Sequence, residues 1–576
     1  MKTVRAYART VFCYYRSMED AIRKATQTAL AEAGANDVSF AVEWPADMIH
    51  GDYAVNAAMA GAKSLGQNPR ELADTLAITI ARELGPLASE VSVAGPGFIN
   101  IHLSPHAVSN VLAHAKDGEW GRGTTRAEQK VVFEYSCPNP FKEMHIGHLM
   151  STIIGEASSR IIESQGARVL RDTYGGDVGP HVAKALWGLQ TQGITEPGSA
   201  AEIGEAYALG SRAYEQDENA KADIDALNKE LYTVLAKEDG ERTAEERALA
   251  ELWRRGRDLS YTSHQAIWHA LGTNFDYILH ESETAPIGMR VVQDATTSGV
   301  FEESEGAIIY NGEKRGLHTL VFITSRGTPT YEAKDVGLAF LKEERLGPLD
   351  YSYIMTASEQ SGHFAVFLSA LSEIAPSVAN KTKHVPHGFL RLTTGKMSSR
   401  EGSVITAREF LEDLVARASE RNPDPTIAEQ VAIGAAKYLI LRQAPGGDII
   451  FDPEKSLSLE GDSGPYLQYA LVRARSLLAT STVSAPSMPV YETDVPLLAR
   501  LIARFPEVVA RAERLQAPHT ITQYLTHLAG EWNSYYASGR IIGSDDEANK
   551  VALVSAFATT MQSGLAFLGI PAPEKM

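Results

Sequence analysis

The chain has 576 residues, too many for a single hydrophobic core, and we expect about three to four domains. Its composition, 44% hydrophobic and 22% charged, is that of an ordinary soluble globular protein. The formal net charge of −18 argues mildly against a nucleic-acid partner, but a large acidic protein can still carry a basic groove.

The cysteines and the N-terminus bear on the cellular compartment. Cys13 and Cys137 cannot build a disulfide framework or a zinc site of the usual kind, so we expect a reducing, cytoplasmic setting. The sequence has no uninterrupted run of about eighteen apolar residues, which predicts no membrane span. Residues 1–17 are basic but lack a long apolar run and a cleavage site, so we interpret them as an N-terminal extension rather than a signal peptide.

Residues 18–116 are typical of a small α+β domain. An amphipathic helix is predicted over 18–35, a second helical stretch ends at Leu65, and Asn68-Pro69 begins a third helix because Pro is tolerated in a first turn. Residues 91–103 alternate like a strand around a Gly-Pro-Gly turn. A linker rich in Gly, Thr and charged residues follows.

After this linker the pattern changes to strand, loop and helix. Residues 131–135 predict a buried strand, 145–165 a long helix and 168–171 a second strand, followed by a Gly-rich turn at 174–179. A strand, a helix and a strand around a Gly-rich crevice begin a doubly wound parallel sheet. We therefore predict an α/β, Rossmann-like catalytic domain over 128–425.

The rest of the chain adds helices and a few strands. A charged helical stretch at 200–260 lies inside the α/β pattern and predicts an insertion at about 183–290. From residue 426 the pattern is almost wholly helical, which predicts a separate all-α domain over 426–576. Further strands are expected at 319–323, 351–356 and 384–392.

The segment Lys142-Glu143-Met144-His145-Ile146-Gly147-His148 lies where the first loop meets the long helix. A helix N-terminus favours phosphate through its N–H groups and its dipole. The imidazoles of His145 and His148 can donate to triphosphate oxygens, and Gly147 leaves room for adenosine to pack against the backbone. Taken alone, the segment is equally well interpreted as two solvent-facing histidines at a helix start.

A second segment, Lys396-Met397-Ser398-Ser399, is a short basic loop. Lys and Arg on a flexible loop can close over the leaving pyrophosphate and supply charge mainly in the transition state. Such a loop alone is more often simply solvated, but the two segments in this order, with an α/β core between them, predict an ATP site. Asp177, in the Gly-rich turn, is a candidate for ordering that site, or else a turn-stabilising acid.

The pair of segments resembles the signatures of class I aminoacyl-tRNA synthetases, and the residues around them are similar to arginyl-tRNA synthetases in particular. The similarity covers essentially the chain from about residue 18, with the weakest match over 195–260. The other segments that carry it are Glu134-Tyr135-Ser136-Cys137-Pro138-Asn139, Leu149-Met150-Ser151-Thr152-Ile153-Ile154-Gly155, His50-Gly51-Asp52-Tyr53, Ala94-Gly95-Pro96-Gly97-Phe98-Ile99-Asn100, Gly464-Pro465-Tyr466-Leu467-Gln468-Tyr469-Ala470 and Ala572-Pro573-Glu574-Lys575-Met576.

The resemblance implies an arginine site. Asp335 and Tyr331 resemble the pair that recognises the guanidinium, and a planar cation with several donors does call for a carboxylate and a phenolic acceptor. Without the resemblance, Asp335 would pass for a surface acid. The further implied residues are Asn139 and Gln360 for the α-amino and carboxylate groups, Glu134 as a second carboxylate, Cys137 where relatives commonly have Ser, and His363 in the same wall.

The resemblance also implies contacts with tRNA. The helical C-terminal domain resembles the family's anticodon-binding domain, and the N-terminal domain resembles the one that contacts the tRNA D-loop. Aromatic and Arg side chains suit stacking on unpaired bases, although a single aromatic residue more often belongs to the core. The implied residues are Phe98, Asn100, Tyr466, Arg473, Tyr535, Tyr536 and Met576.

The implied activity is arginine–tRNA ligation: L-arginine and ATP give arginyl-adenylate, and the arginyl group then passes to tRNA(Arg). We expect ATP with Mg²⁺, no zinc or other metal site, a monomer, and a need for tRNA before arginine is activated. His145, His148, Lys396 and Lys142 would act on the phosphates. Ser399 stands where the class signature has a second Lys, so the shares of Lys396 and Lys142 stay open. The rival hypotheses are a class I synthetase for another amino acid, an adenylate-forming ligase for a small molecule, and a non-catalytic tRNA-binding paralogue.

Overall fold

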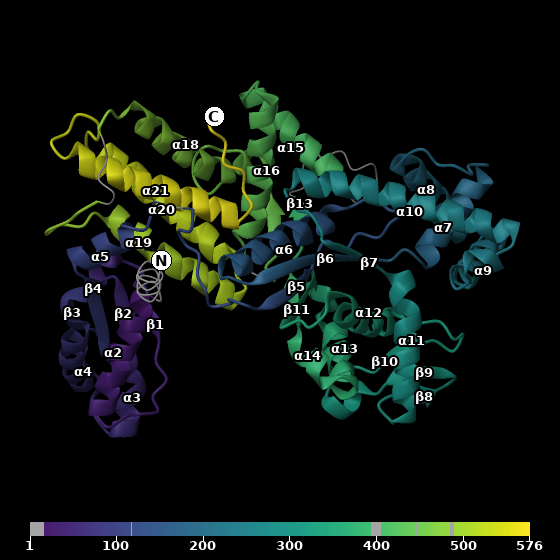
Figure 1. The fold of residues 1–576 in the computed structure, drawn as a ribbon, viewed down its shortest axis with the longest axis horizontal. Helices are drawn as coiled ribbons and strands as arrows, with labels where there is room; N and C mark the ends of the chain where they lie inside the picture. Colours follow the sequence, from purple (N-terminus) through teal and green to yellow (C-terminus); the bar gives the residue numbers. More distant parts are fainter. Residues whose placement is uncertain (1–16, 117, 393–404, 445, 484–488) are drawn as a thin grey trace, which may run out of the picture. The chain divides into compact units, whose positions relative to one another are not determined.

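The structure is a computed structural model that describes residues 17–116, 118–392, 405–444, 446–483 and 489–576. Contacts between residues divide the chain into two compact units (Figure 1). The first unit joins the residues before 126 to those after 458, and the second spans 126–458.

The N-terminal part of the first unit is an antiparallel sheet accompanied by helices, as predicted. The strand order is β1-β2-β4-β3, and the strand expected over 91–103 is a hairpin of two strands. Side-chain caps from Ser17 and Asn68 begin two of the expected helices. The elements are β1 (Val42–Glu43), β2 (Tyr53–Val55), β3 (Ala88–Ala94), β4 (Phe98–Leu103), α2 (Met18–Glu32), α3 (Ala57–Leu65), α4 (Pro69–Leu84) and α5 (Pro105–Leu112).

The C-terminal part of the first unit is helical, which confirms the predicted all-α character. Its helices are α18 (Gly464–Thr480), α19 (Leu497–Leu515), α20 (His519–Ala537) and α21 (Glu547–Phe567).

The segment that ends in Asp52 and Tyr53 joins the N-terminal sheet to α19. Arg500 Nη1 lies 2.5 Å from Asp52 Oδ2, and the Tyr53 hydroxyl donates to Glu507 Oε2 at 2.8 Å. The Leu103 N–H also donates to Asp52 Oδ2, at 2.7 Å. This part of the family resemblance therefore has a structural explanation: the acid and the phenol hold the first unit together.

A five-stranded parallel sheet forms the centre of the second unit and confirms the doubly wound α/β class. The order is β12-β11-β5-β6-β7, so the chain moves from β5 to β6 and β7 and then places β11 and β12 on the other side of β5. Ligands of such sheets bind at this reversal, beyond the carboxyl ends of the strands. The strands are β5 (Lys130–Glu134), β6 (Arg168–Gly175), β7 (Tyr277–His280), β11 (Tyr351–Ala357) and β12 (Thr382–His387).

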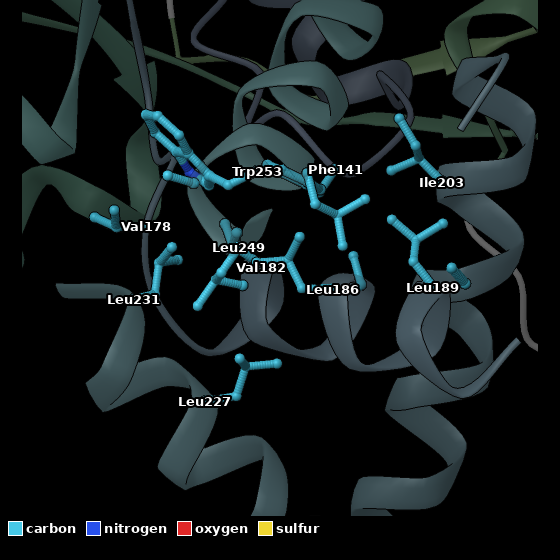
Figure 2. Packing of buried hydrophobic residues seen from close by; sticks show 14 of the residues in the cluster. Phe141, Val178, Val182, Leu186, Leu189, Ile203, Leu227, Leu231, Leu249 and Trp253 are labelled. Atoms are coloured by element: carbon cyan, nitrogen blue, oxygen red, sulfur yellow. The ribbon is translucent and has the colours of Figure 1, made fainter. Parts of the chain in front are cut away.

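Four helices between β6 and β7 pack around a hydrophobic core of their own (Figure 2). Phe141, from the loop after β5, is fully buried in this core beside Val182, Leu186 and Trp253. The core therefore attaches the helices to that loop, and the helical character expected for 200–260 is confirmed. The helices are α7 (Pro180–Thr191), α8 (Ala200–Gln216), α9 (Glu218–Leu235) and α10 (Ala244–Ala270).

Two strand predictions are only partly right. The strand expected at 319–323 forms as β10 (Leu320–Ile323), but it lies in a small antiparallel sheet with β8 (Glu302–Ser304) and β9 (Ala307–Tyr310). The strand expected at 384–392 divides into β12 and β13 (Leu390–Leu392), and β13 pairs with β14 (Ile449–Phe451). A close approach separates the two, because a Cβ on Gly388 would lie 2.2 Å from the Gly447 carbonyl oxygen.

The remaining helices of the second unit surround the sheet. The long helix predicted over 145–165 is α6, and α11 packs closely against α12. A Cβ on Gly288 of α11 would lie 1.8 Å from the Ala333 carbonyl oxygen of α12, so only glycine permits this crossing. The helices are α6 (Ile146–Ser164), α11 (Glu281–Thr297), α12 (Tyr331–Leu346), α13 (Ser361–Ile374), α14 (Pro376–Lys381), α15 (Ala407–Arg421), α16 (Pro425–Leu441) and α17 (Pro453–Ser456).

Gly288→Ala should destabilise the protein, because the added methyl group must push the α12 backbone away from α11. We expect a loss of about 3 kcal/mol in the free energy of unfolding, measured by urea denaturation. Gly204→Ala is the matched control, since Gly204 also lies inside a helix but a Cβ there meets nothing within 4 Å. That variant should be neutral or stabilised by about 0.5–1 kcal/mol. Equal losses of unfolding free energy in the two variants would contradict the close contact of α11 with α12 at Gly288.

Candidate active site

The loop that leaves β5 has a strained backbone held in place by side chains. Ser136, Cys137 and Phe141 have φ values of 71°, 49° and 65°, a region that residues other than glycine rarely adopt. Such conformations persist only where the surroundings enforce them. The Ser136 N–H donates to Ser151 Oγ at 3.0 Å, and the Phe141 N–H donates to Ser260 Oγ at 2.9 Å. The loop therefore delivers the chain from the strand end to the start of α6 along one fixed path.

The start of α6 is capped by the two signature histidines. The Gly147 N–H donates to His145 Nδ1 at 3.0 Å, and the His145 N–H donates to His148 Nδ1 at 3.2 Å. The ring centroids are 3.8 Å apart. A nitrogen that accepts a hydrogen bond carries no proton, so each ring, when neutral, must carry its proton on Nε2. The capping arrangement thus selects the tautomer and reserves two Nε2–H groups as donors.

Both histidines are held neutral in the absence of a ligand. Partial burial and the Lys142 ammonium lower the pKa of His145. Burial, followed by the neighbouring imidazoles and Lys142, lowers the pKa of His148 well below its usual range. A bound phosphate would act in the opposite direction, because an anion stabilises the imidazolium. The helix start is therefore suited to an anion, although its two imidazoles carry no positive charge until an anion binds.

The two flanks of this helix start come from distant parts of the sequence. The Lys142 ammonium lies 4.9 Å from the centroid of the Tyr207 ring on α8, and the Lys142 carbonyl oxygen is 3.1 Å from His264 Nε2 on α10. On the other side, the Ile146 N–H donates to the Ile405 carbonyl oxygen at 3.3 Å.

The residues that follow the second signature contact the start of α6. Lys396, Met397, Ser398 and Ser399 lie outside the described residues. The chain is described again from residue 405, where Thr406 forms an antiparallel bridge with His145 and the Ala407 N–H donates to the Met144 carbonyl oxygen at 2.7 Å. The structure therefore holds residues 405–407 directly at the helix start.

A buried ammonium lies between two buried carboxylates, one at the end of β5 and one within β6. Lys342 Nζ of α12 is 2.5 Å from Glu134 Oε2 of β5 and 2.9 Å from Asp172 Oδ2 of β6. Burial raises the pKa of Glu134 to about 7, although Lys342 opposes this shift. Burial opposes the charge on Lys342, but the two carboxylates outweigh it and raise the pKa of the ammonium. With all three groups charged, the cluster carries one net negative charge.

Asp335 lies two turns before Lys342 on α12, so both side chains lie on the same face. Asp335, Glu134 and Lys342 line one cavity with residues of β11 and α13. His363 Nε2 lies 2.6 Å from Asp335 Oδ2, while Tyr331 is exposed at the start of α12. The structure thus brings together three of the residues that the resemblance implied and adds Lys342.

Asn139 and Gln360 occupy different positions at the same edge of the sheet. Asn139 Oδ1 accepts from the Gly176 N–H at 2.9 Å, which joins the loop after β5 to the end of β6. Gln360 is exposed in the turn that follows β11. The Cys137 thiol lies 3.8 Å from Glu134 Oε1, and burial raises its pKa well above the usual range, so the sulfur keeps its proton.

Asp177 is fully buried and bonded within the protein. Its carboxylate accepts from the Ser282 N–H at 2.9 Å and from the Ser282 hydroxyl at 2.8 Å, and its carbonyl oxygen accepts from Trp253 Nε1 at 2.7 Å. These are the contacts that a turn-stabilising acid would make, since they attach the first turn of α11 to the Gly-rich turn. The assignment of Asp177 to ATP stays a prediction.

Sequence reasoning missed Lys342 and Asp172. A signal for Lys342 was present, because α12 has an apolar stripe at Leu338, Ala339 and Leu346 and Lys342 falls on it. A charge on a buried stripe requires a partner of opposite sign. Nothing in the sequence identifies Asp172, on the neighbouring strand, as that partner.

The residues implied for tRNA lie in the first unit. Phe98 is exposed at the start of β4, whereas Asn100 is buried two residues further along that strand. The Arg473 guanidinium lies 3.9 Å from the centroid of the Tyr536 ring, and both residues line a groove with Arg540. The Tyr466 hydroxyl accepts from Asn533 Nδ2 at 2.9 Å, and Tyr535 and Met576 are half-buried.

Comparison with known families decides the identity of this site. The chain matches the family model of the catalytic domain of class I tRNA synthetases (R) over residues 107–452. The chain belongs to the class I arginyl-tRNA synthetases. The model of the arginyl-tRNA synthetase N-terminal domain matches residues 16–103, and the model of the DALR anticodon binding domain matches residues 467–576.

Similar arginyl-tRNA synthetases align over almost the whole chain. The arginine–tRNA ligase of Shigella sonnei is 30% identical over 592 residues, with 96% of this chain and 98% of the relative covered. That of Porphyromonas gingivalis is 29% identical over 541 residues, covering 86% and 90%. The solved structure of the Thermus thermophilus arginyl-tRNA synthetase has a TM-score of 0.79 at 26% identity and covers 97% of this chain and 100% of that one. The chain is accordingly an arginine–tRNA ligase that uses ATP.

Two kinds of feature are absent from the described part of this arginyl-tRNA synthetase. Within the described ranges, no helix is long and apolar enough to cross a membrane. Among the same residues, no group of three or more His, Cys, Asp or Glu side chains is placed to hold a metal ion.

Substitutions at His145 should separate helix capping from catalysis in this synthetase. His145→Asn keeps a good cap but removes the Nε2–H donor, whereas His145→Ala removes both. We expect both variants to lose about 100- to 1,000-fold in the rate of arginyl-adenylate formation. Only the Ala variant should also lose about 1 kcal/mol in the free energy of unfolding. A wild-type rate in His145→Asn would show that the donor has no catalytic part.

Proposed function

We propose that arginine and ATP bind along the carboxyl edge of the parallel sheet, arginine over Glu134 and Asp335 and the ATP phosphates at the start of α6. The observation that carries this proposal is the loop after β5, because a single short segment leads from Glu134 to His145. This short segment therefore keeps the arginine-site carboxylates near the helix start that would bind the anion. Amino-acid activation requires this pairing of a site for the amino acid and a site for the triphosphate.

The charges around Asp335 favour a guanidinium as the side chain bound there. When both of its carboxylates are ionised, the Glu134–Asp172–Lys342 cluster supplies one net negative charge, and an ionised Asp335 adds another within the same cavity. A guanidinium stays charged at any physiological pH and offers several donors in a planar fork, so it can bind a carboxylate in bidentate geometry. The compact, strongly hydrated ammonium of lysine fits this geometry less well. Tyr331, exposed at the start of α12, would accept from the same fork.

The α-amino and carboxylate groups of arginine would then reach Asn139 and Gln360. Asn139 is already oriented by the Gly176 N–H, so its amide is held in one position. Cys137 lies beside Glu134 as a protonated thiol and supplies a weak S–H donor where a hydroxyl would supply a strong one.

The ATP phosphates would bind the Nε2–H groups of His145 and His148, with Gly147 permitting close approach of the adenosine. The hydrogen bonds from such neutral donors become stronger as negative charge grows on the transferring phosphoryl group. They therefore stabilise the transition state more than the bound substrate. The positive charges of Lys142 and Lys396 would lie beside the β- and γ-phosphates and attract them. ATP would enter as its Mg²⁺ complex, in which phosphates and water supply most of the ligands.

The reaction then needs no covalent bond to the enzyme. An arginine carboxylate oxygen attacks the α-phosphorus, the bond from that phosphorus to the β-phosphate oxygen breaks, and pyrophosphate leaves. The terminal ribose hydroxyl of tRNA(Arg) next attacks the arginyl carbonyl carbon, gives up its proton, and AMP leaves. Catalysis consists of positioning and electrostatic stabilisation.

The tRNA would contact the first unit through Phe98, Asn100 and the helical groove. Arg473 and Tyr536 stack on one another beside Arg540, an arrangement that suits an unpaired base and its phosphate. Tyr466, Tyr535 and Met576 would extend the same surface. We further propose that the enzyme acts as a cytoplasmic monomer.

Amino-acid-dependent ATP–pyrophosphate exchange tests the arginine site. Across the twenty amino acids, only arginine should support exchange, and exchange should require tRNA. Asp335→Ala should raise the Kd for arginine at least about 100-fold, because the paired carboxylate is lost, while the Kd for ATP stays the same. Glu344→Ala is the matched control, since Glu344 is an exposed carboxylate on the same helix. Exchange driven by another amino acid, or unchanged arginine binding in Asp335→Ala, would contradict the proposal.

A further inference from the structure

The imidazole of His363 lies between two carboxylates of α12. His363 Nε2 is 2.6 Å from Asp335 Oδ2, and Nδ1 is 3.4 Å from Glu332 Oε1. All three side chains are less than one-fifth exposed. A ring with a carboxylate on each nitrogen is stabilised as a cation, since only the imidazolium can donate from both nitrogens. Asp335 and Glu332 accordingly outweigh burial and raise the pKa of His363 to about 9.

The other charged groups near this pair do not supply a competing cation. Lys334, next to Asp335 on α12, is paired with Glu281 at 2.5 Å. On β12, His384 Nε2 is 2.8 Å from Thr356 Oγ1, and the Phe364 ring lies against both imidazoles. Burial, then the neighbouring imidazoles, lower the pKa of His384 to about 4, so it is neutral at physiological pH.

The charged group on the other side of Asp335 is already paired. Across the shared cavity, Lys342 is bound by Glu134 and Asp172 and faces them rather than Asp335. Among the residues that the structure describes, therefore, the cation in contact with Asp335 is the His363 imidazolium. It occupies the carboxylate oxygen that a bidentate guanidinium would require.

We propose that His363 holds the place of the arginine guanidinium and gives up its proton when arginine binds, so that arginine binding and proton release are coupled. The inference rests on the proposed assignment of Asp335 to the guanidinium. Two adjacent cations on one carboxylate repel each other, and of the two only the imidazolium can become neutral, because arginine does not deprotonate in proteins. His363 is thus a positioning residue that keeps the Asp335 carboxylate oriented until the substrate replaces it.

The coupling has a definite sign. A group that loses a proton on binding makes the affinity rise with pH until the pH reaches its pKa in the free protein. Arginine should therefore bind more tightly as the pH rises toward the pKa of His363, by about ten-fold for each pH unit. A residue that only supports Asp335 would give the opposite result when removed, because its loss would weaken arginine binding at every pH.

Titration calorimetry of the full-length enzyme with arginine alone measures this coupling. In two buffers of different ionisation enthalpy at pH 7, wild-type enzyme should release close to one proton for each arginine bound, and its Kd should fall about ten-fold between pH 6.5 and 7.5. His363→Gln keeps a neutral donor near Asp335, so it should release no proton, show a flat Kd over this range, and bind arginine more tightly than wild type at pH 6.5. Titration of arginine itself is common to both proteins and cancels in the comparison.

Control variants make each outcome decisive. His384→Asn should release the same proton as wild type, since that imidazole is already neutral, and His363→Asn should repeat the behaviour of His363→Gln if the longer amide disturbs packing. Weaker binding in both His363 variants, or wild-type binding without proton release, would overturn the coupling while leaving the arginine site intact. Unchanged arginine binding in Asp335→Ala would instead show that the site assignment itself is wrong.

Discussion

The rest of the site depends on the ammonium of Lys342, which is buried between carboxylates of two adjacent strands. It joins α12 to Glu134 of β5 and Asp172 of β6, and without it two buried carboxylates would repel each other until one took up a proton. Because Asp335 lies two turns earlier on α12, the ion pair also determines which way Asp335 faces. One buried cation thereby sets the register between the sheet and the helix that carries the proposed arginine contacts.

The second constraint is the strained loop after β5, which leads from Glu134 to the helix cap at His145. The loop is fixed by Ser151, by Ser260 and by the burial of Phe141 in the core of the inserted helices. The insertion therefore has a structural connection to the site, because it holds the loop that runs between the proposed arginine site and the proposed phosphate site. An acidic pocket next to a neutral cluster of hydrogen-bond donors matches a cationic amino acid that reacts with a triphosphate.

The sequence predicted the features that are local. The β5 strand, the α6 helix and the position of two histidines at its start follow from short-range pattern, and the resemblance to a family supplied Asp335, Tyr331 and Gln360. It did not supply the pairings: Lys342 is 208 positions from Glu134, and His363, although implied in the same wall, pairs with Asp335 only once α13 packs beside α12. The division of the 384–392 strand depends likewise on a distant contact with β14.

The most direct test of the account is a crystal structure with a non-hydrolysable arginyl-adenylate analogue. We predict that the guanidinium contacts Asp335 with His363 displaced from it, that Lys342 keeps both of its carboxylates, and that the adenylate phosphate lies within hydrogen-bond distance of the Nε2–H groups of His145 and His148. A guanidinium bound away from Asp335, with the His363–Asp335 pair intact, would contradict the account.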